Sequence, residues 1–124
     1  MELSLFFKSI VDQDECAVVV CSRTHEIIYM NPAAVQNYAR YGGSTLVGRS
    51  ILECHNEHSC EVIKNVVSWF EESEDNNRVH TYFNPKQQKD VYMIALRNEE
   101  KELIGYYEKH EYRKVDESPF YRMK

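Results

Sequence analysis

The sequence lacks any long hydrophobic run, since no window approaches the roughly 20 apolar residues that a membrane span requires. It also lacks an excess of positive charge, because 15 Lys and Arg residues stand against 20 Asp and Glu, for a net charge of −5. That balance argues against nucleic acid, whose phosphates call for a basic surface. The apolar N-terminus has neither a basic start nor a small-residue cleavage site, so we expect no signal peptide and no membrane partner.

Motifs of enzymes and of structural metal sites are absent as well. No glycine-rich phosphate loop is found, because Gly42 and Gly43 follow a predicted helix instead of preceding one. The four cysteines form no evident disulfide framework, so we expect reduced thiols and a cytoplasmic location. Zinc would need a second ligand pair, and Cys16 and Cys21 are spaced so that one strand would point them to opposite faces. We therefore expect one domain without catalytic activity.

The chain does contain a regular succession of helical and strand-like segments. Residues 3–11 have the spacing of a short amphipathic helix. Asn31 before Pro32 predicts a helix start, because Asn caps helices and Pro suits the first helical position, and this helix should run to about Arg40. Strands are predicted, in chain order, at residues 16–22, 26–30, 78–83, 91–97 and 102–113. Short connections between them predict an α+β fold, with an antiparallel sheet and helices on one face.

Three stretches resemble motifs of the PAS domain, the small sensor module of signalling proteins. Residues 26–34 (EIIYMNPAA) are similar to the family's I-x-Y-x-N-x-A stretch, and residues 47–50 (VGRS) to its hydrophobic-G-R/K-S/P stretch. Residues 98–105 (NEEKELIG) resemble the turn between its last two strands, although the first glycine of that turn is missing here. The resemblance implies a five-stranded sheet in the order 2-1-5-4-3, whose concave face is covered by helices around a ligand pocket.

The resemblance also sets expectations for domain limits and partners. It implies a single PAS domain over residues 1–113, followed by a tail over residues 114–124. Asn31, Pro32 and Gly48 are expected to have structural roles in it. PAS domains often dimerise through the N-terminal helix and the outer sheet face, so a homodimer is expected, together with a signalling partner protein.

The segment from Cys54 to Cys60 (CHNEHSC) is the strongest candidate for chemistry. It precedes a helix on which two adjoining apolar stripes are predicted, one of Val62, Val66 and Trp69 and the other of Ile63, Val67 and Phe70. His58 lies one helical turn before Val62. In haem-binding PAS domains, the iron-ligating histidine sits near the start of this helix, one turn before a branched apolar residue. The resemblance thus makes haem the leading cofactor hypothesis, with iron ligated by His58, or by His55 as the second choice.

Other interpretations of the same segment stay open. A histidine near a helix start can cap the helix, bond a backbone carbonyl or face water, so the segment can be purely structural. Flavin photochemistry has no supporting motif, since Ile51 occupies the place of the family's reactive cysteine. On the last strand, alternation puts Tyr106, His110 and Tyr112 on one face.

These features predict a sensory PAS module that binds a small ligand or cofactor in its pocket and forms dimers. The cofactor-binding residues expected are His58, His55, Val62, Val66 and Tyr106. Two alternatives are a ligand-free protein-interaction module and a carrier of a small organic molecule.

Overall fold

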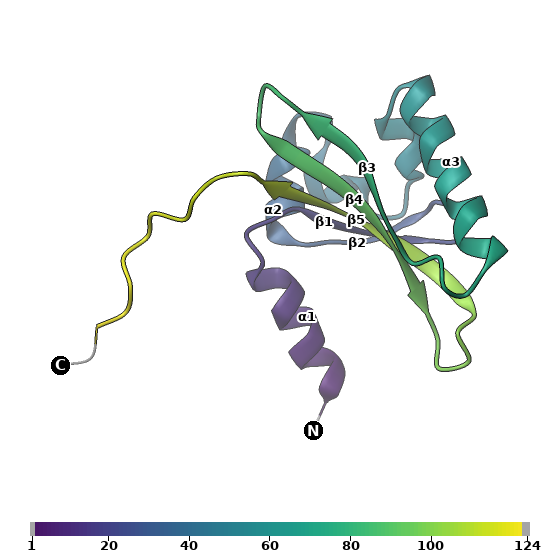
Figure 1. Ribbon diagram of the computed structural model, residues 1–124, viewed down its shortest axis with the longest axis horizontal. Helices are drawn as coiled ribbons and strands as arrows, with labels where there is room; N and C mark the ends of the chain where they lie inside the picture. Colours follow the sequence, from purple (N-terminus) through teal and green to yellow (C-terminus); the bar gives the residue numbers. More distant parts are fainter. Residues whose placement is uncertain (1, 123–124) are drawn as a thin grey trace.

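The predicted hairpin is formed by β1 (Val18–Ser22) and β2 (Ile27–Met30) in the computed structural model, which describes residues 2–122. On its other side β1 pairs with β5 (Leu103–Tyr112), which pairs with β4 (Lys89–Arg97), and β3 (Arg78–Asn84) forms the far edge. Every neighbouring pair is antiparallel, and the five-stranded order is β2-β1-β5-β4-β3. The predicted α+β fold and the order 2-1-5-4-3 are thus confirmed (Figure 1).

Helix α3 (Glu57–Glu72) covers one face of the sheet, alongside β4 and β5. Of its two apolar stripes, the structure buries Ile63, Val67 and Phe70, which join the hydrophobic core, while Trp69 stays exposed. Asn56 caps the helix, since its side-chain oxygen accepts a hydrogen bond from the Ser59 N–H at 2.8 Å. The polar segment before α3 is therefore, in part, a helix start.

Helix α2 (Pro32–Asn37) begins where the Asn-Pro pair predicts, with Asn31 as its cap. It ends at Asn37, earlier than the predicted end near Arg40, and the chain continues through the 3₁₀ turns η1 (Ala39–Tyr41), η2 (Gly43–Leu46) and η3 (Ile51–Cys54). Gly42 has φ +118°, a left-handed conformation that glycine adopts without strain, and this breaks the helical path.

Asn31 also fastens the sheet to the N-terminal helix. Its side chain is fully buried, and its oxygen accepts hydrogen bonds from the Val18 and Ala34 N–H groups, both at 2.9 Å. Its amide donates to the carbonyls of Val11 and Cys16 at 3.0 and 2.9 Å. One side chain thus satisfies backbone groups of three elements.

The two ends of the chain extend away from the sheet (Figure 1). Helix α1 (Leu3–Gln13) buries none of its residues, and residues 114–122 form neither helix nor strand. The domain predicted for residues 1–113 begins at residue 1, and the tail predicted for residues 114–124 ends at residue 124. Both of these end positions lie outside the described residues. Within residues 2–122, no helix combines the length and the apolar character needed to cross a membrane.

Candidate functional site

A cavity of about 390 Å³ lies between the first turns of α3 and the inner face of β3, β4 and β5. Tyr38, just after α2, closes one side of it. The remaining lining is His55, Asn56, His58, Ser59, Val62, Ile63, Thr81, Tyr82, Asn84, Lys89, Val91, Met93, Glu108 and His110. A volume of this size suits a small organic molecule. The lining contains both apolar and polar side chains.

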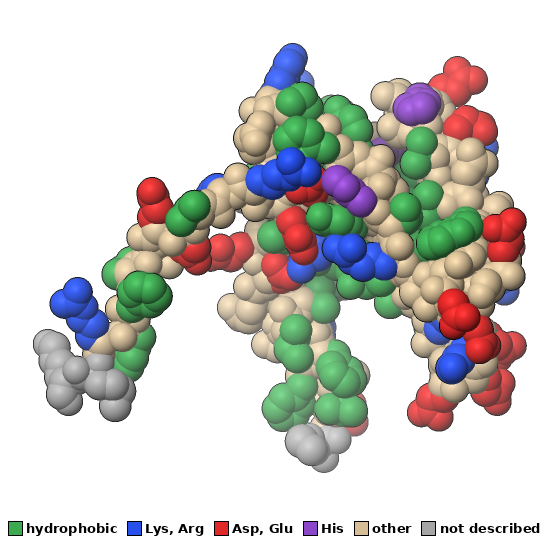
Figure 2. Space-filling model, viewed as in Figure 1, with side chains coloured by type: hydrophobic (Ala, Val, Ile, Leu, Met, Phe, Trp, Pro, Cys, Tyr) green, Lys and Arg blue, Asp and Glu red, His purple; other side chains and the backbone are tan. Residues whose placement is uncertain are grey.

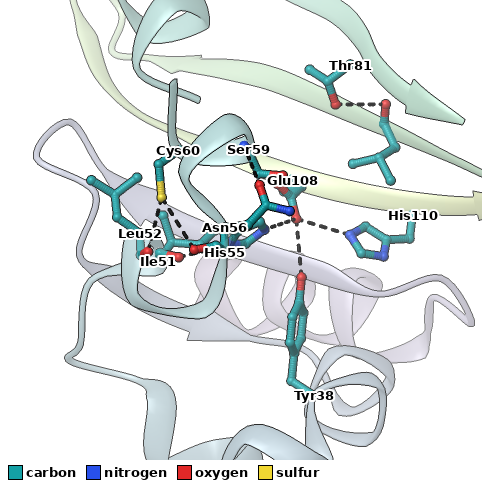
Figure 3. A network of polar contacts seen from close by, with 11 residues as sticks. Tyr38, Ile51, Leu52, His55, Asn56, Ser59, Cys60, Thr81, Glu108 and His110 are labelled. Carbon is teal, nitrogen blue, oxygen red and sulfur yellow. Dashed lines mark hydrogen bonds and ion pairs between the residues drawn. The ribbon is translucent and has the colours of Figure 1, made fainter. Parts of the chain in front are cut away.

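Glu108 is the centre of a buried polar cluster on the floor of this cavity (Figure 3). Its oxygen Oε1 accepts a hydrogen bond from His110 Nε2 at 3.1 Å and a longer one from the Tyr38 hydroxyl at 3.4 Å. His55 Nε2 lies 3.8 Å from the same oxygen and forms an ion pair with it when protonated. The cluster joins the central strand β5 to the segment that leads into α3.

The surroundings of His55 favour its doubly protonated form. Its Nδ1 lies 2.9 Å from the carbonyl oxygen of Ile51, which can only accept a hydrogen bond, so Nδ1 carries a proton. Its Nε2 faces the Glu108 carboxylate. Burial disfavours the charged ring, but the contacts with Glu108 and with the Ile51 carbonyl outweigh it and raise the pKa of His55 above its ordinary value.

The charge of Glu108 is stabilised by the same contacts. Burial by itself would raise the pKa of this carboxyl group, but the hydrogen bonds from the rings of His110 and His55 lower it to about 2. Glu108 is therefore ionised at neutral pH. A buried, ionised carboxylate held by two imidazoles forms a fixed negative charge at the base of the cavity.

Two further polar groups of the lining have no partner in the described part of the chain. His110 Nδ1 is buried and receives no hydrogen bond among residues 2–122. Lys89 is only 7% exposed, and within that same range its ammonium group forms no ion pair. Burial lowers the pKa of Lys89, although the charge of Glu108 acts in the opposite direction. Buried polar groups are normally paired, so His110 Nδ1 points to a missing partner, and Lys89 borders the same cavity.

The residues predicted from the sequence are distributed unevenly around this site. His55 and Val62 line the cavity, and His55 also belongs to the Glu108 cluster. His58 lines the rim with an exposed side chain, whereas the sequence pattern pointed it into the interior. Val66 packs partly buried against the core, and Tyr106 is fully buried there, with its hydroxyl 2.8 Å from His25 Nδ1. Val66 and Tyr106 are not part of the cavity lining.

The two cysteines of the Cys54–Cys60 segment are free thiols. Cys60 Sγ donates a hydrogen bond to the Leu52 carbonyl oxygen at 3.2 Å, which ties α3 to η3. The part of the chain from residue 2 to residue 122 contains no group of three or more His, Cys, Asp or Glu side chains arranged to hold a metal ion. In this structure, Cys60 fastens the turn before the helix.

The lining does not fit haem well. Of the two candidate iron ligands, His55 directs its second ring nitrogen, Nε2, to Glu108, and His58 has an exposed side chain. An apolar macrocycle would also have to cover the ionised Glu108 and the ammonium of Lys89, at a large desolvation cost. The chemistry of the floor suits a small polar molecule better.

The residues at the centre of this site, namely Glu108, Lys89 and Tyr38, were not predicted from the sequence. The signal for Glu108 was available, because alternation along the last strand places it between Tyr106 and His110 on the same face. A carboxylate on the buried face of a central strand is itself an indication of a site. Lys89 lies before the strand predicted for residues 91–97, whereas it is the first residue of β4.

Comparison with protein-family models and with curated proteins finds no match to this sequence. Among solved structures, the chain is similar to the PAS domain of a protein from Colwellia psychrerythraea, with 15% identity, a TM-score of 0.68, and coverage of 89% of this chain and 96% of that one. It is also similar to a sensory box sensor histidine kinase from Vibrio cholerae, with 14% identity, a TM-score of 0.59, and coverage of 88% and 90%.

A third similar structure is an RNA-binding light-oxygen-voltage receptor, with 16% identity and a TM-score of 0.63. The match covers 87% of this chain and 32% of that receptor. Since all three identities are low, the likeness establishes the fold and leaves the ligand to be argued from the cavity.

Proposed function

The chain has the PAS fold, and from this premise we propose that it is a cytoplasmic sensory module that binds a small ligand and catalyses no reaction. The single observation that carries this proposal is the cavity, whose floor holds a buried carboxylate, the buried His110 Nδ1 and the Lys89 side chain, the last two without a partner among residues 2–122. The free thiols of all four cysteines fit the reducing conditions of the cytoplasm.

A ligand in this cavity would act on the start of α3. The first turn of the helix and His55 line the cavity, whereas the other end of the helix is fixed to β4. There the Arg97 guanidinium donates hydrogen bonds to the carbonyls of Phe70 and Ser73 at 2.6 and 3.1 Å. With one end held, a ligand that contacts Glu108 and α3 together would shift the position of the helix start relative to β5.

Titration of the ¹⁵N-labelled protein with a library of small polar compounds tests ligand binding. We expect at least one compound to shift the amide signals of residues around the cavity in a saturable manner. Val62→Trp, which fills the cavity, should abolish these shifts, and Glu61→Trp, on the exposed side of the same helix, should leave them intact. If no compound shifts these signals, or if Val62→Trp has no effect, the ligand-sensing function is wrong.

We also propose that two copies of the chain associate through α1. Five large apolar side chains of this helix are exposed, Leu3, Leu5, Phe6, Phe7 and Ile10, and Figure 2 shows them gathered on the projecting helix. Contiguous exposed apolar surface of this kind marks an interaction site in most proteins. The helix is anchored by its other end, where the Tyr29 hydroxyl donates a hydrogen bond to Asp12.

Sedimentation of the full chain tests this association. The wild-type protein should sediment as a dimer, and the double variant Phe6→Asp, Phe7→Asp as a monomer, because two buried carboxylates would oppose the contact. Val115→Asp places the same charge on an exposed apolar residue of the tail and should leave the dimer unchanged. A wild-type monomer, or a double variant that still dimerises, contradicts the proposal.

Haem ligation through His58 or His55 stays a prediction, which the visible spectrum of the protein mixed with haem tests directly. On the arguments above we expect no sharp Soret band. A band that is lost only in His58→Ala or only in His55→Ala would replace the polar-ligand proposal by a haem sensor. A ligand-free interaction module would show neither this band nor any response to the library.

A further inference from the structure

Building on the proposed ligand-binding function, we propose that the cavity recognises a short carboxylic acid that carries a hydroxyl or amino group. The carboxylate of the ligand would pair with Lys89, and its hydroxyl or amino group would donate a hydrogen bond to His110 Nδ1. Both protein groups line the cavity, and both lack a partner within residues 2–122.

The chemistry at His110 follows from the hydrogen bond on the other side of its ring. The ionised carboxylate of Glu108 can only accept, so His110 Nε2, at 3.1 Å from it, carries the ring proton. In the neutral imidazole, Nδ1 is then a bare acceptor. It is buried and unpaired, so a donor from a ligand is required to satisfy it.

The chemistry at Lys89 is complementary. Its side chain is buried at the start of β4, and its ammonium group can only donate hydrogen bonds. The acidic group with which it interacts electrostatically is Glu108. Its Oε1 already accepts hydrogen bonds from His110 and Tyr38 and faces His55 Nε2. An anionic group brought by a ligand would supply the counter-charge that a buried lysine normally has.

The register of the sheet makes Lys89 and His110 neighbours on the inner face. Val91 on β4 lies directly opposite His110 on β5, and Lys89 is two residues before Val91, on the same face. Lys89 and His110 are therefore diagonal neighbours, whose Cβ atoms lie about 7 Å apart in a regular antiparallel pair. A molecule of two to four carbons is therefore small enough to contact both side chains at once, and the cavity of about 390 Å³ holds it.

Binding of matched compounds to the full chain tests this inference. The probes are glycolate, 3-hydroxypropionate and 4-hydroxybutyrate, the amino acids glycine, β-alanine and 4-aminobutyrate, and the plain acids acetate, propionate and butyrate. Amide shifts of cavity residues are followed for each probe at neutral pH. We expect at least one hydroxy or amino acid to bind about tenfold or more tightly than the plain acid of the same length, the loss expected when a buried acceptor stays unpaired.

Variants then assign the two contacts. Lys89→Met, which keeps an unbranched side chain but removes the ammonium group, should abolish binding of the tightest probe, whereas Lys86→Met, at an exposed lysine of the β3–β4 turn, should bind as the wild type does. His110→Phe should remove the preference over the plain acid while acid binding through Lys89 persists. Should His110→Phe fail to fold, Lys89→Met still decides the inference.

The inference is overturned if the plain acids bind as tightly as the substituted ones, if Lys89→Met binds normally, or if none of the nine probes saturates. If none of the nine probes binds but a library compound without these groups does, the inference is overturned and the proposed sensory function stands. If neither the probes nor the library shifts cavity signals, both proposals fall together.

Discussion

The inner face of the sheet has two halves that differ in how they are filled. Beneath the second half of α3, Val67 and Phe70 pack with Tyr106 and Cys21 into the buried hydrophobic core, and we call this part the dry half. Beneath the first turns of α3, Val62 faces Lys89, Glu108 and His110 across the cavity, and these four residues define the hollow half. One helix and one central strand contribute to both halves.

This contrast shows how a small fold can combine stability with a site. Close packing in the dry half supplies the hydrophobic stabilisation that a domain of this size depends on. The hollow half forgoes part of that packing and holds charged groups, an arrangement that proteins tolerate where a ligand is bound. The difference can be tested by making equal changes in both halves.

The largest effect is expected for Phe70→Ala in the dry half. Phe70 is fully buried, and removing its ring should lower the free energy of unfolding by about 3–5 kcal/mol. The neighbouring Trp69→Ala, at an exposed ring of the same helix, should cost far less. Urea unfolding of the two variants measures both values, and equal losses would contradict the assignment of the dry half.

The second prediction compares the same substitution in the two halves. Val67→Ala should cost about 2 kcal/mol, because two buried methyl groups are removed from a packed core. Val62→Ala should cost about 0.5 kcal/mol or less, because its side chain borders the cavity and the variant only enlarges it. Urea midpoints that fail to separate the two variants would show that the hollow half is packed as tightly as the dry half.

The third prediction concerns the hydrogen bonds that fix α3 to β4. Arg97→Met removes the donor for the Phe70 and Ser73 carbonyls and should cost about 1–2 kcal/mol. Hydrogen exchange should rise at the end of α3 and stay unchanged at its start. Arg49→Met, which breaks an exposed ion pair with Glu53, is the control. It should lower the free energy of unfolding by less than about 1 kcal/mol, as is usual for a surface ion pair. Faster exchange along the whole helix would mean that Arg97 does not act locally.

Most of the fold was accessible from the sequence, because it depends on local signals. The Asn31-Pro32 helix start, the hairpin of β1 and β2 and the short strand connections are each set by neighbouring residues. The end of α2 was less predictable, since the 3₁₀ turns that follow it depend on contacts with distant elements.

The site was accessible only in part, because it depends on contacts between distant residues. The two stripes of α3 were predicted equally apolar, and only packing decides that Val67 and Phe70 face the core while Val62 borders a cavity. His55 was singled out for its place near the helix start, but its partner Glu108 follows it by 53 positions in the chain. Pairing of this kind becomes visible once β5 is placed at the centre of the sheet.

The smallest predicted effect is a pH dependence confined to the hollow half. The pKa of Glu108 is lowered, so its contribution to stability is present above its unfolded value and is lost only as the pH falls through about 2. The pKa of His55 is raised, so its contribution is complete below its ordinary value of 6.5 and is lost as the pH rises through its higher folded value. Between about pH 5.5 and pH 8.5, only His55 of this pair changes its charge.

Glu108→Gln removes the charge that raises the pKa of His55, so burial should then lower it. The stability difference between wild type and variant should therefore shrink as the pH rises through the folded pKa of His55. His25, whose pKa is lowered by burial and by Lys64, titrates in both proteins and cancels in this difference. Unfolding by urea across this pH range, together with NMR titration of the His55 ring, measures both quantities.

Glu111→Gln alters the next carboxylate on β5, which pairs with Lys109, and should leave the His55 titration unchanged. A stability difference that stays constant with pH would show that His55 and Glu108 do not interact in the folded protein.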